Sequence, residues 1–153
     1  MPENSTVRQA RQAGALRLIK NKQNRRGSGV RSIQEAPFMK NGLYSIHITM
    51  LDGVKGRDSG VLILRDGLLL GGGPYFWSIG AYTFGEGNWK GHLTTNQHSP
   101  FADPFVRPLF GGQEVSSGFS GTFAGDSAEA FGTVLVGTRS LSFRATLKWL
   151  ANA

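Results

Sequence analysis

The stretch whose local structure is specified most clearly reads LSFRATLKW, at residues 141–149 near the end of the chain. Its apolar positions are Leu141, Phe143, Ala145, Leu147 and Trp149, and they alternate with Ser142, Arg144, Thr146 and Lys148. Because successive side chains of a strand point to opposite faces, this period of two predicts a β-strand with one buried and one wet face. The same alternation recurs near residue 44, with Tyr44, Ile46, Ile48 and Met50 set against Ser45, His47 and Thr49.

Six further strands are predicted between these two, which makes eight. We place them near residues 59–65, 68–72, 77–84, 88–98, 114–123 and 128–136. Asp66-Gly67, between two apolar runs, is the strongest hairpin signal in the chain, because both residue types accept the positive φ of a tight turn. Neighbours in sequence are therefore expected to pair antiparallel.

Other connections also have the composition of turns or loops. Three more tight turns are predicted at residues 85–88, 125–126 and 137–138, each containing glycine. Residues 99–112 contain Pro100, Pro104 and Pro108, so we expect a long loop rather than a central strand. Eight sequential antiparallel strands avoid unpaired edges by closing, which favours an all-β, up-and-down barrel of lipocalin type over an open sheet or sandwich.

The chain divides by charge near Met39. Residues 1–38 hold eight Lys or Arg against two Glu, a balance of +6, whereas residues 39–153 hold nine basic and eight acidic residues. The domain organisation predicted is a basic N-terminal extension (1–38) and one barrel domain (39–153), since about 115 residues close a single core. With no cysteine and no apolar run of about 20 residues, we expect a cytoplasmic protein without a membrane helix.

Three interpretations compete for residues 1–38. Arg25 and Arg26 could contact nucleic acid, because clustered cations release counterions from a phosphate backbone. An Arg-rich segment nearly free of acids is also typical of organelle-targeting peptides. The favoured interpretation is a disordered tail or upstream extension without a role, since Met39 directly precedes the first convincing strand. Direct nucleic-acid binding is expected, if anywhere, only from this segment.

The barrel interior raises a second functional class, a carrier or sensor of a small apolar ligand. The residues considered for filling the centre are Trp77, Trp89, Phe119, Phe123, Phe143 and Trp149. Those that would leave room are Gly80, Ala81, Gly91, Gly118, Gly121, Ala130, Gly132 and Ala145. In the long loop, Phe101, Phe105 and Phe110 are candidates for a lid, for a cover of one barrel end, or for a dimer contact; we favour the two structural roles.

Signals for catalysis are weak. The histidines are His47, His92 and His98, and the separation of His92 from His98, about 20 Å along a strand, is too large for joint metal coordination. His98 with Asp103 is a conceivable acid–base couple across the loop, but no nucleophile elbow, phosphate-binding loop or zinc motif accompanies it. We expect no enzyme, no metal and no cofactor.

Four segments resemble the GrlR-like proteins, small bacterial negative regulators associated with type III secretion genes. They are residues 39–44 (MKNGLY), 61–67 (VLILRDG), 71–73 (GGG) and 80–82 (GAY), and the likeness covers Met39 to about Leu150. The resemblance implies a lipocalin-like barrel that forms a homodimer and sequesters a transcriptional activator. The family's acidic, partner-binding loop corresponds to the turn with Glu86, Gly87 and Asn88, where Glu86 is the one acidic residue.

Overall fold

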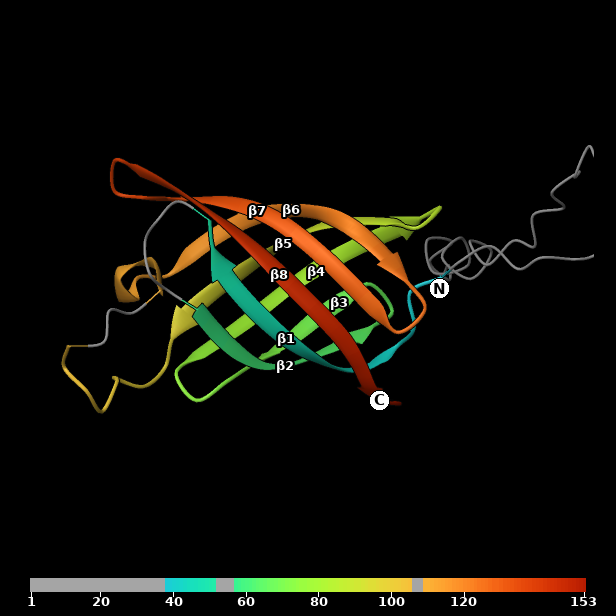
Figure 1. Cartoon of the computed structure of the whole chain (residues 1–153), viewed down its shortest axis with the longest axis horizontal. Helices are drawn as coiled ribbons and strands as arrows, with labels where there is room; N and C mark the ends of the chain where they lie inside the picture. Colours follow the sequence, from blue (N-terminus) through green and yellow to red (C-terminus); the bar gives the residue numbers. More distant parts are fainter. Residues whose placement is uncertain (1–37, 52–56, 106–108) are drawn as a thin grey trace, which may run out of the picture. The chain divides into compact units, whose positions relative to one another are not determined.

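The structure is a computed structural model, and it describes residues 38–51, 57–105 and 109–153. These residues form eight strands and one short segment, η1, which has the hydrogen bonding of a 3-10 turn but non-helical φ at Phe110 and Gly111 (Figure 1). The strands are β1 (Gly42–Met50), β2 (Arg57–Arg65), β3 (Leu68–Gly72), β4 (Phe76–Gly85), β5 (Asn88–Gln97), β6 (Val115–Ala124), β7 (Ser127–Val136) and β8 (Arg139–Ala151), and η1 is Leu109–Gly112.

Each strand pairs antiparallel with the next, and β8 returns to pair with β1. Closure joins Leu43–Met50 to Phe143–Ala151, so that the first and last strands cover each other's edges. The predicted all-β, eight-stranded, up-and-down closed barrel is thus confirmed, and its topology is lipocalin-like. The predicted strand positions agree with the structure to within a few residues.

The hairpin turns have the predicted backbone geometry. Asp66 and Gly67 have φ of 50° and 84°, and Glu86 and Gly87 have φ of 54° and 79°. Two successive positive φ values define a type I′ turn, whose twist matches that of the flanking strands. Gly125 and Gly137, at 56° and 63°, supply the positive φ in the other two predicted turns.

The core lies inside the barrel and consists of one face of every strand. Along β8 the buried side chains are Leu141, Phe143, Ala145 and Leu147, with Trp149 packed against them, as predicted. Of the residues considered for the centre, Trp89, Phe119, Phe123 and Phe143 are buried. Aromatic contacts such as Trp89–Phe119, at 4.7 Å between ring centroids, hold this part of the core together.

Outward positions in two strands were predicted wrongly. Trp77 and Ala81 of β4 and Gly118 of β6 lie on the outside of the barrel, and Trp77 is 37% exposed. In β4 the reason is register: Gly80 pairs with Leu69 and Leu93, both of which face inward, so Phe76 and Tyr82 share its inner face. The more apolar set of β4 therefore faces away from the core.

Residues 1–37 lie outside the described part of the chain, so the predictions for the N-terminal extension, including Arg25 and Arg26, remain predictions. Within the described ranges no helix has the length and apolar character needed to cross a bilayer.

Candidate protein-binding surfaces

The barrel interior is occupied by side chains. Beneath Phe110 a remaining cavity of about 20 Å³ is lined by apolar residues and by Asp58, Ser78 and Thr95. A single water needs about this much space. The Ser78 and Thr95 hydroxyls bond to each other at 2.6 Å, which satisfies the buried Thr95, and burial raises the pKa of the Asp58 carboxyl.

The three loop phenylalanines have different environments. Phe110, in η1, is buried and its ring lies 6.4 Å from that of Phe143, while Phe101 contacts the ring of Tyr75 at 4.2 Å. These two side chains cover one end of the barrel. Phe105 is 94% exposed and contributes nothing to that cover. The structure thus brings together two of the three residues proposed as a lid.

The histidines are not gathered at one place. His47 and His92 are exposed on the outer face, and His98 bonds through its ring nitrogens to Ser99 Oγ and to the Gly73 carbonyl. Asp103 instead accepts a hydrogen bond from the Phe105 amide, so the conceivable His98–Asp103 couple is not formed. Across the described residues, no group of three or more His, Asp or Glu side chains is placed to hold a metal ion.

Three acidic residues occupy turns at the same end of the barrel. Asp66, Glu86 and Asp126 belong to the β2–β3, β4–β5 and β6–β7 turns, which an up-and-down topology places together (Figure 1). Each turn contacts the next strand, since the carbonyls of Gly67, Gly87 and Asp126 accept hydrogen bonds from Tyr82, Phe123 and Trp149 at 2.7–2.8 Å. We call this the acidic end.

Neighbouring groups tie the acidic end to the core. Lys40 forms an ion pair with Asp126, and Asn41 exchanges two hydrogen bonds with Asp66 at 2.9 and 3.0 Å. Burial raises the pKa of the Tyr44 phenol to about 12, and Tyr82 and Asp126 add to the shift. The acidic turns are therefore held in place rather than projecting freely.

The outer face of β2, β3 and β4 is apolar, and we call it the apolar face. Its large exposed side chains are Val61, Ile63, Leu68, Leu70, Trp77 and Ile79, each between 37% and 64% exposed. The registers make them neighbours, because Ile63 pairs with Leu70 and Leu70 with Ile79. No carboxylate faces outward within these three strands among the described side chains.

The hairpin prediction used the runs that form this face but did not identify the face itself. A strand with one wet side alternates, whereas Leu62-Ile63-Leu64 and Leu68-Leu69-Leu70 are continuously apolar. In a barrel whose outer side meets solvent, such a run indicates that both faces are apolar. That signal would have located the surface from the sequence.

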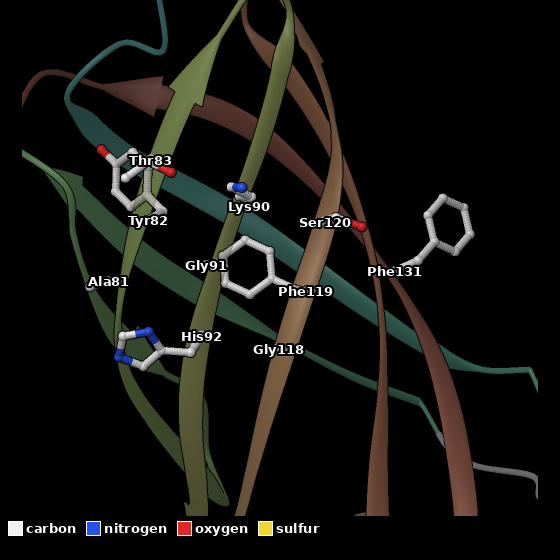
Figure 2. Close-up of a pocket in the computed structure, with 10 residues that line it drawn as sticks. All are labelled: Ala81, Tyr82, Thr83, Lys90, Gly91, His92, Gly118, Phe119, Ser120 and Phe131. Atoms are coloured by element: carbon white, nitrogen blue, oxygen red, sulfur yellow. The ribbon is translucent and has the colours of Figure 1, made fainter. Parts of the chain in front are cut away.

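A groove crosses the outer face of β4, β5 and β6, with Phe131 reaching it from β7 (Figure 2). It measures about 590 Å³ and is flanked by Lys90, His92 and Ser120. Gly118 lines the groove, which is open to solvent, and as a glycine it leaves that outward position without a side chain.

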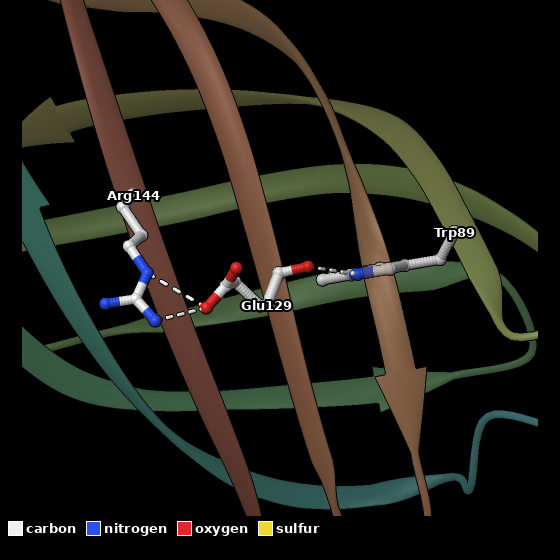
Figure 3. A network of polar contacts seen from close by, with 3 residues as sticks. All are labelled: Trp89, Glu129 and Arg144. Carbon is white, nitrogen blue, oxygen red and sulfur yellow. Dashed lines mark hydrogen bonds and ion pairs between the residues drawn. The ribbon is translucent and has the colours of Figure 1, made fainter.

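A polar network stands beside the groove and links the inner and outer faces of the barrel (Figure 3). The indole Nε1 of Trp89 donates to the Glu129 carbonyl at 2.9 Å, inside the wall. The Glu129 carboxylate accepts from Arg144 Nε at 2.9 Å on the outside and is also bonded by Arg144 Nη2. This fixes β5, β7 and β8 relative to one another.

The class defined by these observations is an eight-stranded, antiparallel, up-and-down closed barrel with an apolar core and an apolar outer face on β2, β3 and β4. No protein-family model matches the chain, and no curated protein matches it either.

Proposed function

We propose that this protein is a non-enzymatic regulator that acts by binding other proteins, as its resemblance to the GrlR-like negative regulators implies. The observation that carries the proposal is the apolar face. Its six large side chains expose on the order of 500 Å² together, which is near the upper limit for a patch on a monomer. Surfaces of that size usually serve association.

The first partner proposed is a second copy of the chain. A standard interface buries about 800 Å² on each side. Smaller outward-facing side chains around the apolar face would bring the buried area closer to that value. The apolar face consists of aliphatic residues and Trp77 and has no acidic group. This composition matches that of homodimer interfaces, in which charged residues are depleted and aromatic residues are enriched. A twofold axis would pair the surface with itself, with no carboxylate at its centre and with Arg65 at its edge beside Leu68.

The second partner proposed is a transcriptional regulator, captured at the acidic end. The sequence places only Glu86 in the turn that corresponds to the family's acidic loop, whereas the barrel adds Asp66 and Asp126 from other turns. Asp126 is paired with Lys40, so the proposal depends mainly on Asp66 and Glu86, whose carboxylates favour a basic partner surface and accelerate encounter. The small-ligand alternative receives less support, because a drug-sized ligand needs about 300 Å³ or more and the cavity beneath Phe110 is about 20 Å³.

Dimerisation is tested with Leu70→Lys, which places a charge at the centre of the apolar face. We expect a homodimer for the unaltered protein and a folded monomer for this variant in sedimentation velocity, with an unchanged far-ultraviolet spectrum. Leu150→Lys, at a half-exposed leucine of β8, is the matched control and should remain dimeric. A monomeric parent, or dimers in both variants, would refute the apolar face as the interface.

Partner capture is tested by affinity purification from the source bacterium with the full chain and with an Asp66→Asn, Glu86→Gln variant. The proposal expects a transcriptional regulator that the parent removes from DNA and that the variant recovers several-fold less well at low salt. Recovery of a small molecule alone, or equal recovery by both proteins, would contradict it.

A further inference from the structure

The wall of the barrel divides between β6 and β7. β6 pairs with β5 along Val115–Thr122, but with β7 only along Phe119–Ala124. β7 pairs with β8 along its full length, but with β6 only along Ser127–Gly132. Residues 115–118 and 133–136 thus have a strand neighbour on one side only, and Figure 1 shows the β7–β8 hairpin diverging from the start of β6. We call this place the β6–β7 fork.

The fork exposes main-chain groups of β7. The Thr133 carbonyl faces β6, since it accepts a hydrogen bond from Ser117 Oγ at 3.1 Å in place of a ladder bond. Alternate residues of a strand direct both N–H and C=O to the same neighbour, so Leu135 presents its own pair toward the fork. The Thr133 carbonyl is bonded to Ser117, but among the described residues no strand pairs with Leu135 on this side, so Leu135 provides a short edge of the kind that accepts an additional strand.

The side chains of this edge do not protect it. Natural edges are usually blocked by charged residues, proline or a bulge. Residues 133–136 read Thr-Val-Leu-Val, without charge, proline or glycine. Val134 is buried and anchors the segment, whereas Leu135 is 75% exposed. The edge is therefore anchored on its inner side and exposes an apolar side chain at Leu135.

The groove of about 590 Å³ continues from the base of the fork, because Gly118 belongs to both regions and Phe131 of β7 lies just before the fork. If a partner strand added beside residues 133–136, one of its side chains would lie next to Leu135, and a side chain further along that strand would reach the groove. Strand addition of this kind takes its affinity from main-chain hydrogen bonds and its specificity from pockets for alternate side chains.

We propose that the β6–β7 fork binds an extended, uncharged segment of a partner protein, which adds to the Thr133–Val136 edge as a short strand. The occupant is a single free segment rather than a folded barrel, because the fork is closed at its base by the Phe119–Gly132 pair and flanked by η1, where Gly111 lies near Val136. This binding goes beyond the proposed function and does not require the apolar face.

The test uses the full chain and a synthetic peptide, acetyl-Lys-Thr-Val-Thr-Leu-Thr-Val-Lys-amide, followed by amide NMR and hydrogen exchange. Saturable shifts are expected at the amides of Gly118, Leu135 and Val136, and exchange of the Leu135 amide should slow at least about tenfold. The matched control is the same peptide with its four central amides N-methylated, which cannot form the ladder. Equal binding of the control, or no shifts at millimolar peptide, would overturn the proposal.

Two variants separate the fork from the apolar face. Leu135→Lys, at an exposed position that should not disturb folding, is expected to weaken peptide binding at least about tenfold and to leave the oligomeric state unchanged. Leu70→Lys should leave peptide binding unchanged. Loss of peptide binding in Leu70→Lys, or loss of dimers in Leu135→Lys, would assign the two surfaces otherwise and refute strand addition at the fork.

Discussion

At the scale of single residues, inward-facing glycines allow the wall to bend. A Cβ added to Gly121 would lie 1.8 Å from the Glu129 carbonyl oxygen, and one added to Gly91 would lie 2.1 Å from that of Ala81. Real Cβ atoms never approach a backbone oxygen so closely, so the neighbouring strand occupies the space of the missing side chain. The Glu129 carbonyl that crosses Gly121 is the one that accepts the Trp89 indole hydrogen bond. Glycine here is required for a polar contact of the core.

Replacing Gly121 with alanine should therefore be costly. We expect Gly121→Ala to lower the free energy of unfolding by about 3 kcal/mol, because backbone rather than a flexible side chain must move. Denaturant unfolding followed by tryptophan fluorescence measures the change. Gly85→Ala is the control, since nothing lies within 4 Å of the added Cβ, and it should change stability by less than about 0.5 kcal/mol. Similar losses in both variants would show that the close approach is not the cause.

At the scale of an element, η1 closes the end of the barrel opposite the acidic end. Phe110, Gly111 and Gly112 all have positive φ, from 56° to 73°. For Phe110 this conformation costs about 1–2 kcal/mol relative to ordinary backbone. Burial of its ring against Phe143 more than offsets that cost. The glycines that follow accept the same φ without strain, so the turn holds the ring over the core.

A pair of phenylalanine variants tests this role. Phe110→Ala should lower the free energy of unfolding by about 3 kcal/mol and increase the fluorescence of a hydrophobic dye, because the barrel end opens. Phe105→Ala, at a side chain 94% exposed in the same loop, should stay within about 0.5 kcal/mol of the parent. Differential scanning fluorimetry and dye titration provide the measurements. Equal stability of the two variants would contradict the sealing role of Phe110.

At the scale of the whole molecule, closure depends on strands at opposite ends of the domain. The β1–β8 ladder joins Ser45 to Lys148 and Met50 to Phe143. Without this ladder, β1 and β8 would each have one edge without a strand partner. Such long-range pairing makes folding cooperative and slow, in the millisecond to second range typical of all-β domains. The chain divides into Met1–Ala36 and Pro37–Ala153, and every ladder of the described barrel lies within the second unit.

Removal of residues 1–36 should accordingly leave the barrel intact. We expect the shortened chain to unfold in one transition, with a midpoint within a few degrees of that of the full chain, because all the described core residues remain. Circular dichroism in the near and far ultraviolet should give coincident curves. A large loss of stability would show that the basic segment contributes to the fold and would refute the predicted domain boundary.

Much of the fold could be predicted because its signals are local. Alternation in residues 141–149, glycine in the hairpin turns and proline in the long loop each depend on backbone geometry within a few residues. The binding surfaces depend on which face of each strand is inside. In β4 both faces carry apolar residues, so the sequence makes Trp77 and Phe76 equally plausible core residues. The register of β4 with β3 and β5 places Phe76 inside the barrel. Of the candidate site residues in the long loop, Phe110 is buried and Phe101 packs against Tyr75, whereas Phe105 is exposed.

The amino-acid order by itself determined the number of strands, their antiparallel sequence and the positions of the tight turns, since these follow from the period of two and from positive φ at glycine. Only the tertiary structure decided what the outside of the barrel presents. Closure fixes the register of every strand. Register places Ile63, Leu70 and Ile79 side by side and leaves Leu135 without a partner in β6, and the up-and-down order brings Asp66, Glu86 and Asp126 to one end. Residues so distant in sequence become neighbours only through pairing, which no local pattern specifies.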